Sequence, residues 1–171
     1  MSIVELPSRS SDIPFARDPE QSYTIPARCY LDEDIYQREK EAVFYRNWWY
    51  AGHQSQLLEP GCYLTVQVCE QNIIVVRDKS GELRAYYNVC QHRGHELLFG
   101  SGKVRTITCP YHAWSYGFDG ELKAARNTEK LVDFDKCQFS LKPVQVEVFC
   151  GLVFINLDMQ APALKLQAAD L

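Results

Sequence analysis

The clearest hydrophobic pattern in the chain has a period of two and lies near its middle. Over residues 62–68, Cys, Leu, Val and Val alternate with Tyr, Thr and Gln, which predicts a half-buried strand. A short apolar run at 73–77 predicts a second strand, and 83–87 a third. The sequence Asp-Lys-Ser-Gly at 78–81 is typical of the hairpin turn between them. These segments predict an antiparallel meander that runs directly into Cys90.

Shorter strands are expected in the second half of the chain. They are residues 104–108, 115–118, 121–124, 144–148 and 152–157. Residues 125–140 are polar and predict irregular structure with a helical turn near 131–134. Helices of the kind that connect parallel strands are missing from the pattern, so an antiparallel sheet is favoured.

The N-terminal region has a different character. Residues 1–28 contain four prolines among polar residues and predict an extended arm. Asp32 can cap a helix, and the apolar spacing that follows predicts an amphipathic helix from 33 to about 47. We therefore expect four segments: an arm (1–28), a helix with its connection (29–52), a β domain (53–158) and a linker (159–171).

Composition narrows the class of protein. The 171 residues suit one domain with an appended arm, and 22 acidic against 18 basic residues favour neither nucleic acid nor an anionic membrane as a partner. No secretory signal or membrane-spanning stretch is visible, so a soluble cytoplasmic protein is expected. The seven cysteines are scattered, which disfavours a disulfide framework.

Candidate chemistry gathers between residues 90 and 114. Cys90-x-His92 and, sixteen residues later, Cys109-x-x-His112 each provide one thiolate and one imidazole. Four such ligands could bind a tetrahedral zinc ion, or a two-iron cluster with both cysteines on one iron and both histidines on the other. A common Cys₂His₂ zinc site takes its cysteines from one loop, whereas here each loop supplies one of each ligand, which favours the cluster.

The two motifs, Cys-x-His-Arg-Gly and Cys-Pro-Tyr-His-x-Trp, resemble the Rieske [2Fe–2S] domain of ring-hydroxylating and related oxygenases. The resemblance implies that Cys90 and Cys109 ligate one iron, and His92 and His112 the other. Other cofactor-binding positions of the two loops are Arg93, Gly94, Tyr111 and Trp114. Gly94 is expected to permit a special backbone conformation, Arg93 to orient the loop or contact a subunit, and Tyr111 and Trp114 to shield the cluster. The family usually has glycine where this chain has Ala113.

Residues ahead of the first strand extend the resemblance. The segment from Tyr30 through Phe44-x-x-x-Trp48 to Gly52-His53 is similar to the N-terminal helix of oxygenase α subunits, whereas a free-standing Rieske ferredoxin would start later. The fold implied is mainly β: a Rieske-type antiparallel β-sandwich with two cluster-binding loops, preceded by an arm and a helix. The remaining alternatives are such a ferredoxin, acting as an electron carrier, and a structural zinc domain.

Oxygenases of this family act at a mononuclear iron held by two histidines and a carboxylate. Beyond His92 and His112 the chain has only His53, expected to be a loop or capping residue, and His95, expected to be a polar loop residue or part of an interface. This Fe(II) is therefore expected in a catalytic domain outside these residues. The resemblance implies a reductase or ferredoxin as electron donor, and transfer to the catalytic domain of the same or an adjacent α subunit in a trimer. The sequences of residues 92–98 and 124–127 resemble those of the family branch that acts on carnitine and betaines.

The loops also bear on the reduction potential. Respiratory-chain Rieske proteins of high potential carry an extra cysteine in each loop, joined as a disulfide, and a serine shortly after the second histidine. The matching positions here are His95, Tyr111 and Trp114. We therefore predict a potential at the low end of the range of roughly −150 to +300 mV known for these centres.

Overall fold

The computed structural model describes residues 18, 20, 25–128 and 131–168. The chain divides into two compact units, residues 1–40 and 41–171. Most of the predicted arm (1–28) lies outside the described residues. No helix of the described part is long and apolar enough to cross a membrane.

The N-terminal unit contains two short helices, α1 (Arg28–Leu31) and α2 (Glu33–Glu39). The predicted cap is confirmed, because the Asp32 side chain accepts a hydrogen bond from the backbone N–H of Asp34 at 3.0 Å. The helix does not continue regularly to residue 47. A π-helical turn, η2 (Lys40–Phe44), follows α2, and the side chain of Asn47 donates to the carbonyl oxygen of Val43 at 2.8 Å, which satisfies a carbonyl group at the end of the turn.

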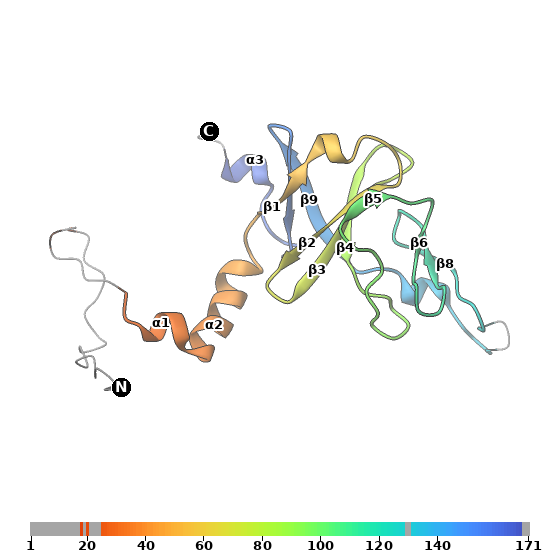
Figure 1. The fold of residues 1–171 in the computed structure, drawn as a ribbon, viewed down its shortest axis with the longest axis horizontal. Helices are drawn as coiled ribbons and strands as arrows, with labels where there is room; N and C mark the ends of the chain where they lie inside the picture. The colour runs from red at the N-terminus through yellow and green to blue at the C-terminus, as the bar shows by residue number, and fades with distance from the viewer. Residues whose placement is uncertain (1–17, 19, 21–24, 129–130, 169–171) are drawn as a thin grey trace, which may run out of the picture. The chain divides into compact units, whose positions relative to one another are not determined.

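The larger unit is built from antiparallel strands, which confirms the expected fold class (Figure 1). A seven-stranded sheet has the order β1-β10-β9-β4-β3-β2-β5, and a three-stranded sheet has the order β6-β7-β8. The strands of the large sheet are β1 (Trp49–His53), β2 (Cys62–Val68), β3 (Gln71–Arg77), β4 (Leu83–Tyr87), β5 (Ser101–Lys103), β9 (Pro143–Phe149) and β10 (Leu152–Asn156). Those of the small sheet are β6 (Ile107–Thr108), β7 (Ser115–Tyr116) and β8 (Leu122–Ala124).

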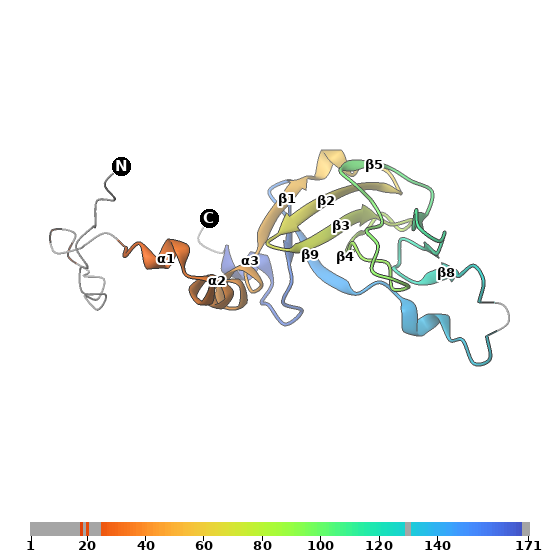
Figure 2. The ribbon, with the colours of Figure 1, turned by 60° about the horizontal axis from the view of Figure 1, so that its bottom comes forward.

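Strand β3 lies between the two parts of the hydrophobic core. Ile73 and Val75 pack with residues of β2, β9 and β10, whereas Ile74 and Val76 pack on the other face with the small sheet and the two motif-bearing loops. All four side chains are fully buried. Burial on both faces explains the continuous apolar run in this strand, in contrast to the alternation in β2. Figure 2 shows β2, β3 and β4 side by side, with β8 beyond one end of them.

Three local predictions were wrong. Trp49 and Tyr50, expected in the connection after the helix, belong instead to an unpredicted strand, β1, which pairs with β10. Of the strand expected at 104–108, only Ile107–Thr108 is extended, as β6, and the preceding strand β5 ends at Lys103. The chain leaves β5 at Val104, whose N–H donates to the carbonyl oxygen of Gly61. The helical turn expected near 131–134 lies later, as the 3₁₀ helix η4 (Lys136–Phe139) capped by the side chain of Asp135.

Two short helices complete the larger unit. The 3₁₀ helix η3 (Gln54–Gln56) is capped by His53, whose side chain accepts from the N–H of Ser55, so the expectation of a capping histidine is confirmed. Helix α3 (Leu164–Gln167) lies in the segment expected to be a linker. It buries Leu164, whose N–H donates to the carboxylate of Glu147 on β9 at 3.0 Å.

Candidate metal centre

The four candidate ligands lie on two loops, one leaving a strand of the large sheet and one leaving a strand of the small sheet. The first loop follows β4 and carries Cys90 and His92; the second connects β6 to β7 and carries Cys109 and His112. Both loops contribute to the same core, in which the two cysteines are 1% and 2% exposed. The rings of the two histidines are 4.7 Å apart between centroids. The structure therefore brings together the two motifs that the sequence separates by sixteen residues.

Both loops contain the same turn. In the first, the N–H of Cys90 donates to the carbonyl oxygen of His95, and the N–H of Gly94 donates back to the carbonyl oxygen of Cys90. In the second, Cys109 donates to Trp114, and Ala113 donates back to Cys109. The backbone N–H of each cysteine thus donates a hydrogen bond to the residue five positions later in the chain. Its carbonyl oxygen accepts one from the residue four positions later.

Gly94 and Ala113 occupy equivalent positions in these turns. Their φ angles are 70° and 58°, both in the left-handed region. This conformation costs a residue with a Cβ atom about 1 to 2 kcal/mol, whereas glycine adopts it freely. The expectation that Gly94 permits a special backbone conformation agrees with this angle. The same geometry explains why glycine suits position 113, and it makes Ala113 a site of local strain.

The donor atoms fit a two-iron cluster. Nδ1 of His92 and Nδ1 of His112 are buried and have no hydrogen-bond partner among the described residues. A buried nitrogen without a partner is costly, and coordination to a metal would remove that cost. The described residues contain no group of three or more His, Cys, Asp or Glu side chains arranged for one metal ion. A cluster of two irons needs only two protein ligands at each iron.

Burial dominates the electrostatics of these groups. It raises the pKa of the Cys90 thiol, and the nearby Cys109 sulfur adds to this effect, while hydrogen bonds from Tyr116 and the His92 backbone oppose it. Burial likewise lowers the pKa of His92, together with repulsion from His112 and Arg93. The environment of His92 thus favours the neutral imidazole, the form that binds metal, whereas burial disfavours the Cys90 thiolate, the form that a bound metal ion would stabilise.

Tyr116 is a functional residue that the sequence analysis missed. Its hydroxyl lies 3.3 Å from Sγ of Cys90 and accepts a hydrogen bond from the N–H of Gln91 at 3.0 Å. The side chain is fully buried, and burial together with the bond to Cys90 raises the pKa of Tyr116. Where high-potential Rieske proteins carry a serine shortly after the second histidine, this chain has Trp114. The residue two positions beyond Trp114 supplies a hydroxyl to the sulfur instead.

Aromatic side chains surround the two histidines. The Trp114 ring, 3% exposed, stacks on His92 with centroids 4.7 Å apart and meets the edges of Phe134 and Phe139. The Tyr111 ring packs on His112 with the ring centroids 3.7 Å apart, but Tyr111 is 56% exposed. His95 and Arg93 are also exposed. Trp114 therefore covers the centre from inside the protein, while Tyr111, His95 and Arg93 form its outer surface.

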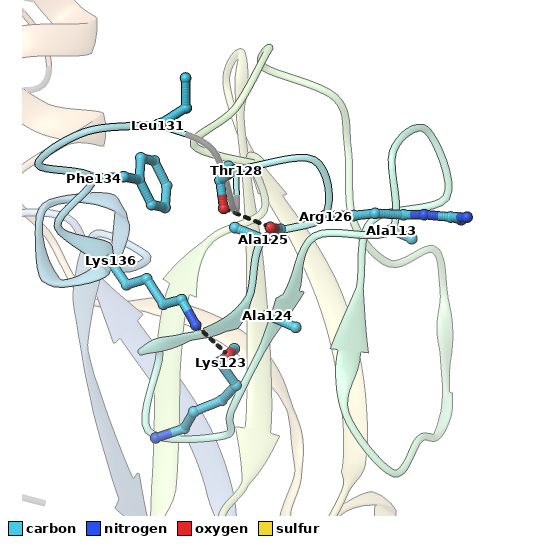
Figure 3. A pocket seen from close by; sticks show the side chains of 9 residues that line it. All are labelled: Ala113, Lys123, Ala124, Ala125, Arg126, Thr128, Leu131, Phe134 and Lys136. Carbon is cyan, nitrogen blue, oxygen red and sulfur yellow. Dashed lines mark hydrogen bonds between the residues drawn. The ribbon is translucent and has the colours of Figure 1, made fainter.

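An open groove of about 510 Å³ adjoins the second loop (Figure 3). Phe134 lines this groove and also contacts Trp114. The basic lining residues are Lys123, Arg126 and Lys136. Lys123 forms ion pairs with Asp119 and Glu121, and Lys136 donates to the backbone carbonyl of Lys123, whereas Arg126 points away from both lysines in the view.

Comparison with known families decides between the two kinds of metal centre. Residues 47–142 match the model of the Rieske [2Fe–2S] domain. The chain belongs to this family. The cofactor of the domain is a [2Fe–2S] cluster, so the interpretation as a structural zinc site is set aside.

The curated relatives of this Rieske domain include oxygenase subunits. The chain is 45% identical over 157 residues to the carnitine monooxygenase oxygenase subunit of Acinetobacter pittii (strain PHEA-2), which covers 91% of this chain and 42% of that protein. It is 35% identical to the glycine betaine monooxygenase oxygenase subunit of Pseudomonas aeruginosa (strain UCBPP-PA14), which covers 92% of this chain and 37% of that protein. The chain thus spans about two fifths of the length of these relatives.

Solved structures give the same picture. The quaternary ammonium Rieske monooxygenase CntA in complex with L-carnitine superposes with a TM-score of 0.84 and 44% identity, covering 91% of this chain and 45% of that one. A naphthalene 1,2-dioxygenase superposes with a TM-score of 0.77 and 35% identity, covering 81% and 32%. The similarity to oxygenase subunits includes nearly all of the chain. The chain therefore contains a Rieske domain of the oxygenase α-subunit type, and not of the free-standing ferredoxin type.

Proposed function

We propose that this chain is the N-terminal electron-transfer portion of the terminal oxygenase component of a Rieske non-haem iron oxygenase. The observation that carries the proposal is the pair of matching turns. Each turn holds one buried cysteine, the two histidine rings lie 4.7 Å apart, and Nδ1 of each ring has no hydrogen-bond partner among the described residues, which supports one shared centre. The similarity to oxygenase subunits over 91% of the chain supports the assignment to an oxygenase.

We assign Cys90 and Cys109 as ligands of one iron, and His92 and His112 as ligands of the other. When bound, a cluster of this type carries one electron at a time. The chain's own contribution is to bury the sulfurs, favour the neutral form of the His92 imidazole and exclude water with Trp114. Arg93, Gly94 and Tyr111 complete the two loops: Gly94 through its backbone conformation, and Arg93 and Tyr111 as part of the exposed surface.

The chain is proposed to receive electrons from a reductase or ferredoxin. The groove beside the second loop is a candidate surface for that donor, because Phe134 lines it and contacts Trp114, which stacks on His92. Electrons would then pass to the catalytic domain of the same or an adjacent subunit, in a trimer. A solved relative whose description names inter-subunit electron transfer supports this step.

The oxygen chemistry is assigned to a mononuclear Fe(II) in a catalytic domain outside these residues, and the substrate class to quaternary ammonium compounds, as in the carnitine and glycine betaine relatives. We divide the chain into an arm (1–28), a helix and connection (29–52), the Rieske domain (53–158) and a linker (159–171). A reducing, cytoplasmic location suits seven cysteines that form no disulfide bond.

Histidine variants test the ligand assignment. His92→Ala and His112→Ala should each abolish the cluster's visible absorbance and EPR signal, because neither iron can spare a protein ligand. His95→Ala is the control: its ring is exposed in the same loop, with Nδ1 2.6 Å from the carbonyl oxygen of Glu96. Its spectrum should stay close to that of the wild type. Loss of the cluster in His95→Ala, or its retention in either ligand variant, contradicts the assignment.

A further inference from the structure

The first ligand loop lacks the strand pairing that closes the second. The second loop leaves β6 and returns as β7, with Ile107 paired to Tyr116 and Thr108 to Ser115. The first loop leaves β4, but residues 96–98 on its return form no strand. A single isolated bridge between Val89 and Glu96 joins its two sides. The turn hydrogen bonds at Cys90 close the tip of the loop, and another interaction holds its returning arm at residues 97 and 98.

The side chain of Asn88, just ahead of Cys90, makes the missing connections. Its Oδ1 accepts hydrogen bonds from the N–H groups of Leu97 and Leu98, both at 3.0 Å, and its Nδ2 donates to the carbonyl oxygen of Leu98 at 2.6 Å. Asn88 is 1% exposed. One side-chain amide thus satisfies three backbone groups on the returning arm, which is the task that a neighbouring strand performs elsewhere in a sheet.

A second layer of polar contacts holds Asn88 itself. Its backbone N–H donates to the carbonyl oxygen of Asn72 on β3, and its Nδ2 lies 3.1 Å from Oδ1 of Asn72 and 3.2 Å from Oε1 of Glu96. Nδ2 of Asn72 donates to the same Glu96 oxygen at 2.7 Å. A buried polar network in which each member has partners rigidifies its surroundings. Here it connects the rigid strand β3 to both sides of the loop.

We propose that Asn88 is a positioning residue for the cluster. Its side-chain amide replaces strand pairing in the first loop, and so holds Cys90 and His92 in place opposite the second loop. This inference rests on the proposed function, because it takes Cys90 and His92 as ligands. It assigns to Asn72 and Glu96 the supporting role of fixing the orientation of that amide.

The test compares Asn88→Ala with Asn156→Ala in the purified chain with its cluster. Asn156 is a matched control: it is 0% exposed, its Nδ2 donates to the carbonyl oxygen of Arg46, and its Oδ1 accepts from the N–H of Asp158. Both substitutions remove a buried amide, but only one of these amides contacts a ligand loop. The measurements are the rate of cluster loss in the presence of a chelator, the EPR spectrum after reduction, and thermal unfolding.

Asn88→Ala should lose its cluster at least about tenfold faster than Asn156→Ala, because three backbone groups of the loop lose their partner. Its EPR g values should shift, while those of Asn156→Ala match the wild type. Equal rates and unchanged EPR spectra at similar thermal stability would overturn the proposal, and would make Asn88 an ordinary core residue. A wild-type chain without a cluster would instead contradict the proposed function.

A rescue experiment covers the case in which Asn88→Ala is recovered without a cluster. Asn88→Asp keeps an acceptor for Leu97 and Leu98 but places a carboxylate oxygen against Glu96 and the carbonyl oxygen of Leu98. Adding Glu96→Gln removes the repulsion between the two carboxylates, so the double variant should retain its cluster roughly threefold longer than Asn88→Asp alone. A double variant no better than the single one would also overturn the proposal.

Discussion

Tyr116→Phe removes one oxygen atom from the protein side of the cluster. That hydroxyl lies 3.3 Å from Sγ of Cys90 and 3.0 Å from the backbone nitrogen of Gln91. A cysteine bound to iron has lost its proton, so the hydroxyl donates to the sulfur and accepts from Gln91. Phenylalanine fills the same buried space but leaves the sulfur without this donor.

The size of the effect follows from the charge on the sulfur. Hydrogen bonds to charged groups are worth about 1.5 to 3 kcal/mol, and an added electron makes the sulfurs more negative, which strengthens the bond on reduction. If the bond strengthens by about 1 kcal/mol, the one-electron potential changes by about 40 mV, because about 1.4 kcal/mol corresponds to 59 mV. We therefore expect Tyr116→Phe to lower the midpoint potential by about 40 mV.

Spectroelectrochemical titration of the purified chain measures this shift directly. Tyr86→Phe is the control, because Tyr86 is also buried but its hydroxyl donates to the carbonyl oxygen of Phe118 at 3.1 Å. That variant should titrate like the wild type while losing some stability. A potential for Tyr116→Phe that is unchanged or higher would refute the reasoning that the hydroxyl stabilises the reduced state.

Three further predictions concern stability and partner binding. Burial opposes ionisation of Asp78, but hydrogen bonds from Ser80, Arg84 and backbone amides outweigh it and hold its pKa at about 2, below the ordinary 3.8. The carboxylate therefore stabilises the fold above about pH 4, and this stabilisation disappears as the pH falls toward 2. Its size is about 1 to 2 kcal/mol, less than the full pKa shift would give, because solvent screens the half-exposed Arg84 side chain. Urea unfolding should show Asp78→Asn less stable than the wild type at pH 7, with the difference lost near pH 2. Ala113→Gly should raise the free energy of unfolding by about 1 kcal/mol, measured the same way, because it relieves the left-handed backbone; a less stable variant would be evidence against strain there. Arg126→Glu should slow reduction of the cluster by an acidic donor roughly tenfold at low salt, with the difference vanishing at high salt, whereas Lys165→Glu on α3 should have little effect in the same stopped-flow assay.

Most strands of the large sheet could be predicted because burial of one or both faces of a strand sets the pattern of apolar residues along it. Alternation in β2 and the apolar run in β3 follow from one and two buried faces respectively, and both were confirmed. Strand β1 was missed because Trp49 and Tyr50 continue the spacing of the preceding helix. Only pairing with β10, more than a hundred residues later, shows that they are extended.

The candidate centre was predictable to a similar extent. Two double motifs identified the four candidate ligands, because few sequences place two thiols and two imidazoles at such spacings. The polar contacts around them were not predictable. Tyr116 contacts Cys90 because the fold brings β7 beside the first loop, and Asn88 contacts Leu97 and Leu98 across a loop whose path the sequence does not show.

The equivalence of Gly94 and Ala113 has the same origin. The histidines sit two and three residues after their cysteines, so the two motifs do not align by eye. Gly94 and Ala113 each follow their cysteine by four residues, and each donates the same turn hydrogen bond to the carbonyl oxygen of that cysteine. These matching bonds show that the two positions are equivalent. The structure thus supplies a physical reason for a glycine preference that the sequence alone could only describe.

Iron and acid-labile sulfide analysis of the purified chain, combined with EPR after reduction, tests the central claim most directly. The account predicts two irons and two sulfides per chain, as the [2Fe–2S] family requires, and an EPR signal in which two nitrogen couplings from His92 and His112 are resolved. A colourless chain with a single zinc, or a cluster without nitrogen couplings, would contradict it.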